Sequence, residues 1–219
     1  MSICPRDRPA RKAGALALLL AASAAGGSAA AGAAAAGALP APGRYALDPP
    51  HTFVEFRAQH KVVGMVLGRF DKTAGTIVVS KNPADCSVDV SIDATSLSTQ
   101  NPVRDADVKG PDFFDAAKFP TVTYQGKGIR KASQGWVMDG TLTIRGVGET
   151  VPVEFRFNGL APAQPDKPDR LGFHAAAAVQ RATFGMAREL LAEIGKESKA
   201  PDVWIEIDVE ALGEAPQKK

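Results

Sequence analysis

The sequence predicts an all-β protein, either a barrel or a sandwich, and three observations support this. Apolar and polar residues alternate with period two through most of the chain after Tyr45, a pattern typical of antiparallel strands with one face toward solvent. Turn signals such as Lys81-Asn82-Pro83 and Pro165 to Asp169 separate the alternating stretches, as in consecutive hairpins. Helical periodicity is rare, so the apolar faces of about eight or nine strands must cover one another.

The chain opens with the pattern of a secretory signal peptide. Basic residues between Arg6 and Lys12 precede the apolar run Ala15 to Ala22, and an Ala/Gly/Ser tract follows, in the order expected of an export signal. We therefore predict a signal peptide over residues 1–38, a short linker over 39–43 and an exported protein. The apolar run is too short for a stable membrane anchor, and Cys4 precedes it, which excludes a lipidated cysteine after the run.

Charge and cysteine content narrow the function further. The formal net charge is +2, but residues 1–38 carry four basic residues and one aspartate, so the remainder carries about −1. This removes the electrostatic argument for a nucleic-acid partner or an anionic membrane surface. Cys86 is the one cysteine after the signal peptide; we expect a buried small side chain and a fold held together by its apolar core.

Each strand is predicted from its own alternation. In chain order, the expected strands are 54–59, 62–70, 76–79, 87–93, 122–124, 138–144, 151–158, 173–179 and 203–210. Val62–Phe70 differs because both of its faces are apolar, which fits burial on both sides, a rim position or a self-association surface. We place the folded domain at 44–212 and a disordered tail at 213–219.

Two stretches interrupt the strand pattern. Asn101–Lys118 is long enough to have a function or a small helix of its own. In Met186–Lys196 the apolar residues recur at helical spacing, which predicts a short amphipathic helix that plugs one end of the fold.

No strong catalytic motif is present, and the clustered acids have ordinary roles available. The sequence lacks a nucleophile elbow, a phosphate loop and a zinc-protease helix. The loop carboxylates Asp105, Asp107, Asp112 and Asp115 could form a paired acid/base site if Asp105 or Asp112 lies close to a second titratable group. Turn and cap roles are commoner for aspartates in such a loop. Arg104 could lock the loop through a bidentate bond to Asp105 or face an anionic headgroup. Because the three histidines do not share one strand face, we predict no metal site.

An ordered set of motifs resembles the YceI-like family of bacterial periplasmic proteins. The motifs span about Gly43 to Leu212 and are Tyr45-Ala-Leu-Asp-Pro-x-His51, His60, Gly68-Arg69-Phe70, Arg104-Asp105, Pro111-Asp112-Phe113-Phe114-Asp115, Phe119-Pro120-Thr121, Gly140-x-Leu142-Thr143-Ile144-Arg145-Gly146-Val147 and Arg181-x-x-Phe184-Gly185-Met186. The resemblance implies an extended, lipocalin-like antiparallel β-barrel of eight strands, to which the two interrupting stretches add one or two short helices. It also implies that the bore holds a polyisoprenoid chain of the quinone or prenyl phosphate type. One departure is Ala106-Asp107-Val108, where the family pattern has x-His-Leu.

We therefore predict a non-catalytic binding protein for an isoprenoid-type lipid, without a cofactor or metal. Side chains expected to face the bore are Val54, Phe56, Ala58, Val90, Ile92, Tyr124, Leu142, Ile144, Phe155, Phe157, Phe173, Ala175, Ala177, Ile205 and Ile207. Ala175 and Ala177 are small enough to leave room for a ligand. The polar end of the ligand is assigned to His60, Arg104, Asp107 and Arg181, and Phe113 and Phe114 are expected to close one end. Two alternatives remain: a structural barrel with a filled core that dimerises through Val62–Phe70, and a lipid-modifying enzyme using the loop carboxylates.

Overall fold

The computed structural model describes residues 39–61, 63–186 and 200–214, and most of them lie in strands. The strands are β1 (Gly43–His60), β2 (Gly64–Phe70), β3 (Thr73–Val79), β4 (Ser87–Asp93), β5 (Leu97–Ser98), β6 (Thr121–Lys127), β7 (Arg130–Lys131), β8 (Trp136–Ile144), β9 (Val147–Ala161), β10 (Arg170–Val179) and β11 (Val203–Gly213). The helices are α1 (Pro102–Lys109) and the 3-10 helices η1 (Pro83–Asp85), η2 (Ala94–Ser96) and η3 (Arg181–Phe184).

Several predicted segments lie outside the described residues. They are the signal peptide over 1–38, most of the helix predicted over Met186–Lys196, and residues 215–219 of the predicted tail. The strands extend slightly beyond the predicted domain of 44–212, since β1 begins at Gly43 and β11 ends at Gly213. In the described part of the chain, no helix has the length and apolar character needed to span a membrane.

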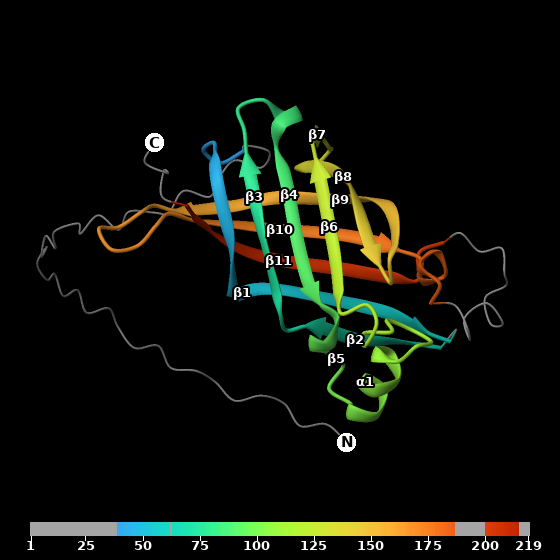
Figure 1. The fold of residues 1–219 in the computed structure, drawn as a ribbon. Coiled ribbons are helices and arrows are strands. Elements are labelled where there is room, and N and C mark those ends of the chain that lie inside the picture. The colour runs from blue at the N-terminus through green and yellow to red at the C-terminus, as the bar shows by residue number, and fades with distance from the viewer. Residues whose placement is uncertain (1–38, 62, 187–199, 215–219) are drawn as a thin grey trace, which may run out of the picture. The chain divides into compact units, whose positions relative to one another are not determined.

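Eight strands close into one antiparallel barrel, which confirms the predicted eight-stranded fold (Figure 1). Going round the barrel, the neighbours are β1, β3, β4, β6, β8, β9, β10 and β11, and β11 pairs with β1 to close the ring. The short strands are added at the edges: β2 pairs with the second half of β1, β5 pairs with β2, and β7 pairs with β8. Closure leaves no open sheet edge in the ring itself.

The antiparallel order defines two ends of the barrel. One end is where β1, β4, β8 and β10 finish and β3, β6, β9 and β11 begin. Helix α1 follows β4 and β5 in the chain and lies beside β5 in Figure 1. We call this the α1 end, and the opposite opening the far end.

β1 changes the side it presents to the interior partway along its length. Tyr45 and Leu47 are buried before the change, whereas Thr52 and Val54 are buried after it. The register with β11 shifts between Leu47 and Thr52, where Pro49-Pro50 supplies no backbone donors to a ladder. The irregularity acts as a bulge that keeps both halves of a long strand facing the interior.

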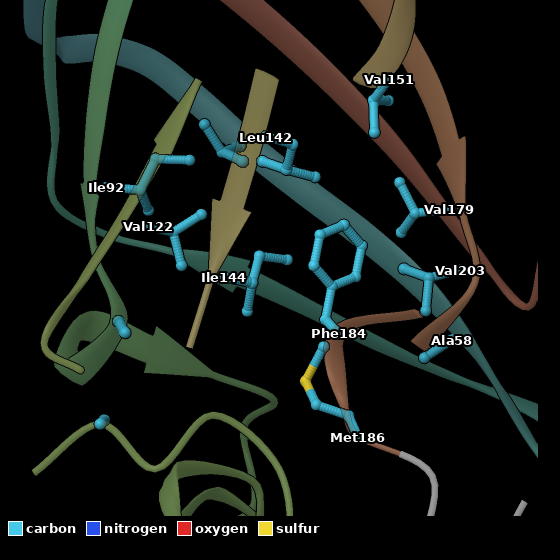
Figure 2. Packing of buried hydrophobic residues seen from close by; sticks show 13 residues of the cluster. Ala58, Ile92, Val122, Leu142, Ile144, Val151, Val179, Phe184, Met186 and Val203 are labelled. Carbon is cyan, nitrogen blue, oxygen red and sulfur yellow. The ribbon is translucent and has the colours of Figure 1, made fainter. Parts of the chain in front are cut away.

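Two apolar clusters pack at the two ends of the barrel. The cluster at the α1 end includes Phe184, whose ring lies among aliphatic side chains from several strands, including Ile144 and Val203 (Figure 2). The far-end cluster is built on Tyr45 of β1 and Leu171 of β10, with further residues of β3, β9, β10 and β11. The space between and beside the two clusters is where the cavity described below lies.

The long connection after β5 contains the short helix that the sequence allowed for. Asn101 accepts hydrogen bonds from the backbone N–H groups of Val103 and Arg104, at 3.1 Å each, and Pro102 occupies the first helical turn. An Asn cap followed by proline satisfies the free donors of a helix start without losing an internal bond. Local sequence therefore fixes where α1 begins.

β2 has one face toward the interior and one toward solvent. Val66 and Phe70 line the cavity, whereas Val63, Met65 and Leu67 are 80%, 46% and 64% exposed. Of the three readings of Val62–Phe70, burial on both sides is therefore wrong, because the alternate residues form an exposed apolar surface.

Candidate functional site

The barrel encloses a cavity of about 780 Å³ whose wall is mostly apolar. Side chains from all eight ring strands contribute to it, together with α1 and the turn that follows. Of the residues predicted to contact a ligand, those that line this cavity are Val54, Phe56, Ala58, His60, Val90, Ile92, Arg104, Asp107, Phe113, Phe114, Tyr124, Leu142, Ile144, Phe155, Phe173, Ala175, Ala177, Arg181, Ile205 and Ile207.

Phe157 is the predicted residue that does not line the cavity. Its ring packs against Phe173, with 5.6 Å between the centroids, as part of the far-end cluster. The alternation placed Phe157 on the same face of β9 as Phe155, which lines the cavity, but the Phe157 ring packs against Phe173 instead of contributing to the lining.

Large side chains in the wall lie against glycines of neighbouring strands. A Cβ on Gly68 would overlap with the ring of Phe56, and one on Gly126 would overlap with the side chain of Met138. A Cβ on Gly140 would lie 2.5 Å from Cζ of Tyr124. None of these three glycines belongs to the cavity lining. Because each glycine offers no side chain, its neighbour can lie flat against the sheet and leave the bore open.

Tyr124 is held against the wall by its hydroxyl as well. The hydroxyl oxygen lies 3.0 Å from the carbonyl oxygen of Met138 and 3.2 Å from that of Val151, and donates to these backbone acceptors. Burial, and next the negative charge of Asp139, raise the pKa of Tyr124 to about 12, against an opposing hydrogen bond from the Gly140 backbone. Tyr124 is therefore a neutral wall residue near pH 7.

The ionisable side chains of the lining gather at the α1 end. Arg104, Asp107 and Asp112 come from α1 and the turn after it, while His60 ends β1 and Arg181 follows β10. At the far end the lining is aliphatic and aromatic, with Cys86 and Ser87 as its small polar members. The cavity is thus polar at one end and apolar at the other.

Thr99 connects Arg104 to Asp105. The Nε of Arg104 donates to the Thr99 hydroxyl at 2.8 Å, and its Nη2 donates to the Thr99 carbonyl at 2.9 Å. The carboxylate of Asp105 accepts from the Thr99 backbone N–H at 2.7 Å and from its hydroxyl at 2.5 Å. The direct bond to Asp105, one of the two roles considered for Arg104, is thus replaced by contacts of both side chains with Thr99, a residue that the sequence did not point to.

This arrangement gives Asp105 a structural role beside the cavity. Desolvation raises its pKa, but the Thr99 hydrogen bonds and the charges of Lys109 and Arg104 outweigh it, so the pKa of Asp105 is lowered overall. Asp105 does not line the cavity, whereas Asp112 does. The paired acid/base arrangement that a catalytic role for Asp105 required is not formed inside the bore.

The two aromatic residues of the turn lie at the α1 end as expected. Phe113 and Phe114 are half-buried, and both line the cavity. The ring of Phe114 meets Phe70 edge-on, at 5.6 Å between centroids, and Phe70 in turn packs against Phe56 at 5.8 Å. This row of rings ties the turn after α1 to β1 and β2.

Arg181 is bound by a carboxylate that the sequence analysis missed. Its Nε lies 2.9 Å from Oδ2 of Asp202, its backbone N–H donates to Oδ1 of Asp202 at 2.8 Å, and its Nη2 donates to the Gln59 carbonyl at 2.6 Å. Asp202 is 1% exposed. The charge of Arg181 is therefore neutralised by Asp202, and the pair joins the ends of β1 and β10 to the start of β11.

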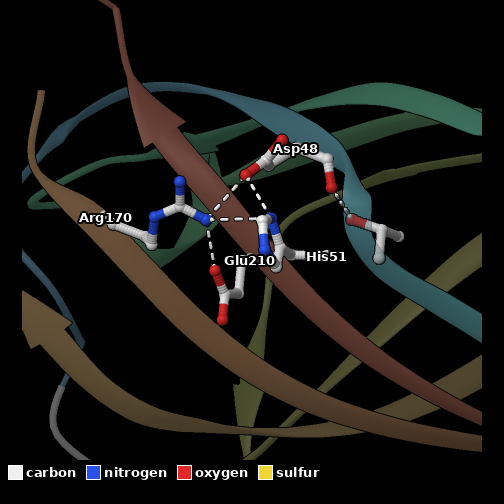
Figure 3. A network of polar contacts seen from close by, with 5 residues as sticks. Asp48, His51, Arg170 and Glu210 are labelled. Atoms are coloured by element: carbon white, nitrogen blue, oxygen red, sulfur yellow. Dashed lines mark hydrogen bonds and ion pairs between the residues drawn. The ribbon is translucent and has the colours of Figure 1, made fainter. Parts of the chain in front are cut away.

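Side chains of β1, β10 and β11 that do not line the cavity form a polar network (Figure 3). Asp48, His51 and Glu210 bring their ligand-type atoms within 4.8 Å of one another. Arg170 bonds to both carboxylates, at 2.6 Å for Asp48, and lies 3.4 Å from Nδ1 of His51. The guanidinium already supplies a positive charge at the centre of this group, so the geometry does not call for a metal ion.

Cys86 is buried, as its sequence context predicted. Its side chain is 5% exposed, and its sulfur lies 3.3 Å from the backbone nitrogen of Ser80. It behaves as a small wall residue at the far end.

Known proteins share this fold and much of this sequence. A family model described as YceI-like domain matches residues 45–211. The protein YceI of Escherichia coli is 32% identical over 162 residues, covering 72% of this chain and 81% of that protein. Among solved structures, the Campylobacter jejuni YCEI protein is 26% identical with a TM-score of 0.57, covering 72% of this chain and 90% of that one.

A more distant structure shares the fold. A polyisoprenoid binding domain from Saccharophagus degradans is 16% identical with a TM-score of 0.58, covering 78% of this chain and 98% of that one. Together with the match of the family model over nearly the whole barrel, these likenesses establish that the chain belongs to the YceI-like family.

Proposed function

We propose that this protein is an exported, non-catalytic binding protein that holds a long-chain polyisoprenoid lipid, of the quinone or prenyl phosphate type, for transport or storage in the periplasm. The observation that supports this most strongly is the largely apolar cavity of about 780 Å³. That volume falls within the ~300–1,000 Å³ range of ligand pockets. An apolar wall binds hydrocarbon because each Å² of apolar surface removed from water contributes about 25 cal/mol to binding. The name of the Saccharophagus degradans domain points to the same ligand class.

The cavity also favours this function over the structural alternative. A barrel with a filled core has no room for a ligand, because protein interiors are close-packed and hold few voids larger than a water molecule. Here Ala175 and Ala177 face the bore from β10, and large neighbours lie flat on glycines. The export proposal rests on the sequence pattern of residues 1–38.

The test identifies the bound lipid and then blocks the cavity with a bulky side chain. Solvent extraction of protein purified from its native periplasm is expected to release a long-chain isoprenoid, seen by mass spectrometry. Ala177→Phe fills the bore and is expected to abolish lipid retention, whereas Ala178→Phe on the exposed face of β10 retains it. A wild-type protein that carries and binds no prenyl lipid, or two variants that retain lipid equally, would contradict the proposal.

The exposed face of β2 further supports a homodimer. Val63, Met65 and Leu67 form an exposed apolar surface. On the side of β2 away from β1, only Arg69 and Phe70 have ladder partners among the described residues, namely Ser98 and Leu97 of β5. An apolar strand with an open edge is a template for pairing with a second strand. Light scattering is expected to give a dimer for the wild type and for the control Leu160→Lys, and a monomer for Leu67→Lys. A monomeric wild type would refute the proposed homodimer.

A further inference from the structure

Thr73 places a hydroxyl beside aliphatic side chains of the cavity wall. It begins β3, pairs with Ile92 of β4, and lines the bore at the α1 end. The next inward residue round the barrel is Val122, which pairs with Ile92, and Ile144 follows on β8 (Figure 2). Thr73 is thus a polar side chain on a rung whose other named members are Ile and Val.

The Thr73 hydroxyl is buried without a hydrogen-bond partner. The residue is 7% exposed, and its Oγ1 finds no partner among the residues that the structure describes. The other two threonines of the lining are bonded to protein: Thr52 donates to the Asp48 carbonyl at 2.9 Å, and Thr99 donates to Asp105. A buried hydroxyl without a partner destabilises the folded state, and valine would have the same shape without that cost.

Water is a poor partner at this position. A buried water needs two to four polar partners, and the side chains beside Thr73 on its rung are aliphatic. On its β4 side, this stretch of β3 is paired in a ladder, and β4 is paired in turn with β6. An oxygen that is part of an apolar molecule meets the hydroxyl without requiring further partners.

We propose that the Thr73 hydroxyl donates a hydrogen bond to a neutral oxygen, a carbonyl or a hydroxyl, on the lipid held in the bore. The inference rests on the proposed function and selects, within it, a quinone or prenol class over a prenyl phosphate. A phosphate would have to be desolvated beside Ile92 and Val122, which is costly without a paired charge. The lipid then lies with its oxygen-bearing group at the α1 end and its hydrocarbon toward the far end.

The charged side chains at the α1 end agree with a neutral group. Arg181 is neutralised by Asp202, and the Nε and Nη2 donors of Arg104 are already used by the Thr99 hydroxyl and carbonyl. Asp107 adds negative charge to the same part of the lining, which disfavours an anion there.

The test compares Thr73→Val with the matched control Thr123→Val, which makes the same change at a side chain of β6 outside the lining. The probes share one prenyl chain and differ in the head: a prenylquinone, a prenol, a prenyl phosphate and the plain hydrocarbon. We expect Thr73→Val to weaken binding of the quinone and the prenol by roughly three- to tenfold. Binding of the hydrocarbon should not change, nor should any binding by the Thr123 variant.

The remaining outcomes separate the two proposals. Thermal unfolding without lipid should show Thr73→Val to be at least as stable as the wild type, since it removes a buried hydroxyl without a partner. Three results would overturn the Thr73 inference alone. Thr73→Val could lose as much affinity for the hydrocarbon as for the oxygenated lipids, or it could lose no affinity for the oxygenated lipids. The third such result is a wild type that binds the prenyl phosphate more tightly than the other probes. A wild type that binds none of the four probes overturns the proposed function and the inference together.

Discussion

Removing Asp202 should destabilise the barrel strongly, because it leaves Arg181 buried and charged. The Arg181 side chain is 15% exposed and that of Asp202 is 2% exposed, with 2.9 Å between Nε and Oδ2. Asp202 also accepts the Arg181 backbone N–H at 2.8 Å. Truncating one partner of a buried pair costs about 3–5 kcal/mol, a large part of the roughly 5–15 kcal/mol that stabilises a domain.

The assay for this prediction is thermal unfolding followed by circular dichroism. For a domain of this size each kcal/mol lowers Tm by about 2–4 °C, so Asp202→Ala is expected to lower Tm by roughly 6–20 °C. Replacing both partners by apolar residues, Arg181→Met with Asp202→Leu, should recover most of that loss, since the uncompensated charge is gone. A Tm change below about 3 °C for Asp202→Ala, or a double variant no more stable than the single one, would refute this reasoning.

The double variant also tests whether Arg181 contacts a lipid. Arg181 lines the cavity, but its guanidinium is occupied by Asp202 and the Gln59 carbonyl. If its role is to join strand ends, the double variant should bind lipid like the wild type once stability is restored. A loss of affinity that remains in a well-folded double variant would restore Arg181 to the predicted ligand contacts.

Two further predictions follow from the wall and from the loop. Gly140→Ala should push the Tyr124 ring into the bore, which lowers stability by about 1–3 kcal/mol and weakens lipid binding. The control is Gly64→Ala, whose new Cβ meets no atom within 4 Å. Equal lipid affinities of the two variants would contradict the prediction. Because the pKa of Asp105 is lowered in the folded state, the stability that its carboxylate contributes is present above the unfolded pKa near 3.8 and is lost as the pH falls through the lowered folded pKa. Asp105→Asn should therefore lower Tm at pH 7, and the Tm difference from the wild type should disappear in acid. A Tm difference that does not depend on pH would exclude this stabilising role of the Asp105 carboxylate.

Alternation along the strands predicted most of the cavity wall. Because successive side chains of a strand point to opposite faces, the period-two pattern placed Phe56, Tyr124, Ala175 and Ile205 on the interior side, where the structure has them. The pattern does not show which inward side chains reach the cavity, so it included Phe157, whose ring packs against Phe173 instead.

Contacts between distant segments were beyond local reasoning. Arg181 and Asp202 are brought together by the barrel, and nothing near either residue in the sequence signals the pair. The change of the inward face at Pro49-Pro50 hid Leu47 from the predicted lining, since alternation continued backwards from Val54 places it outside. The missing partner of Thr73 is also visible only once its neighbours are known.

The glycines beneath the large wall residues influence the width of the bore although they do not contact what it holds. Gly68, Gly126 and Gly140 contribute nothing to the lining, yet each decides whether a bulky neighbour lies flat or projects inward. Substitutions that retune the width of the channel can therefore arise at positions that never meet the cargo. A comparison of cargo preference among related barrels should include these supporting positions, because a search restricted to the lining would overlook them.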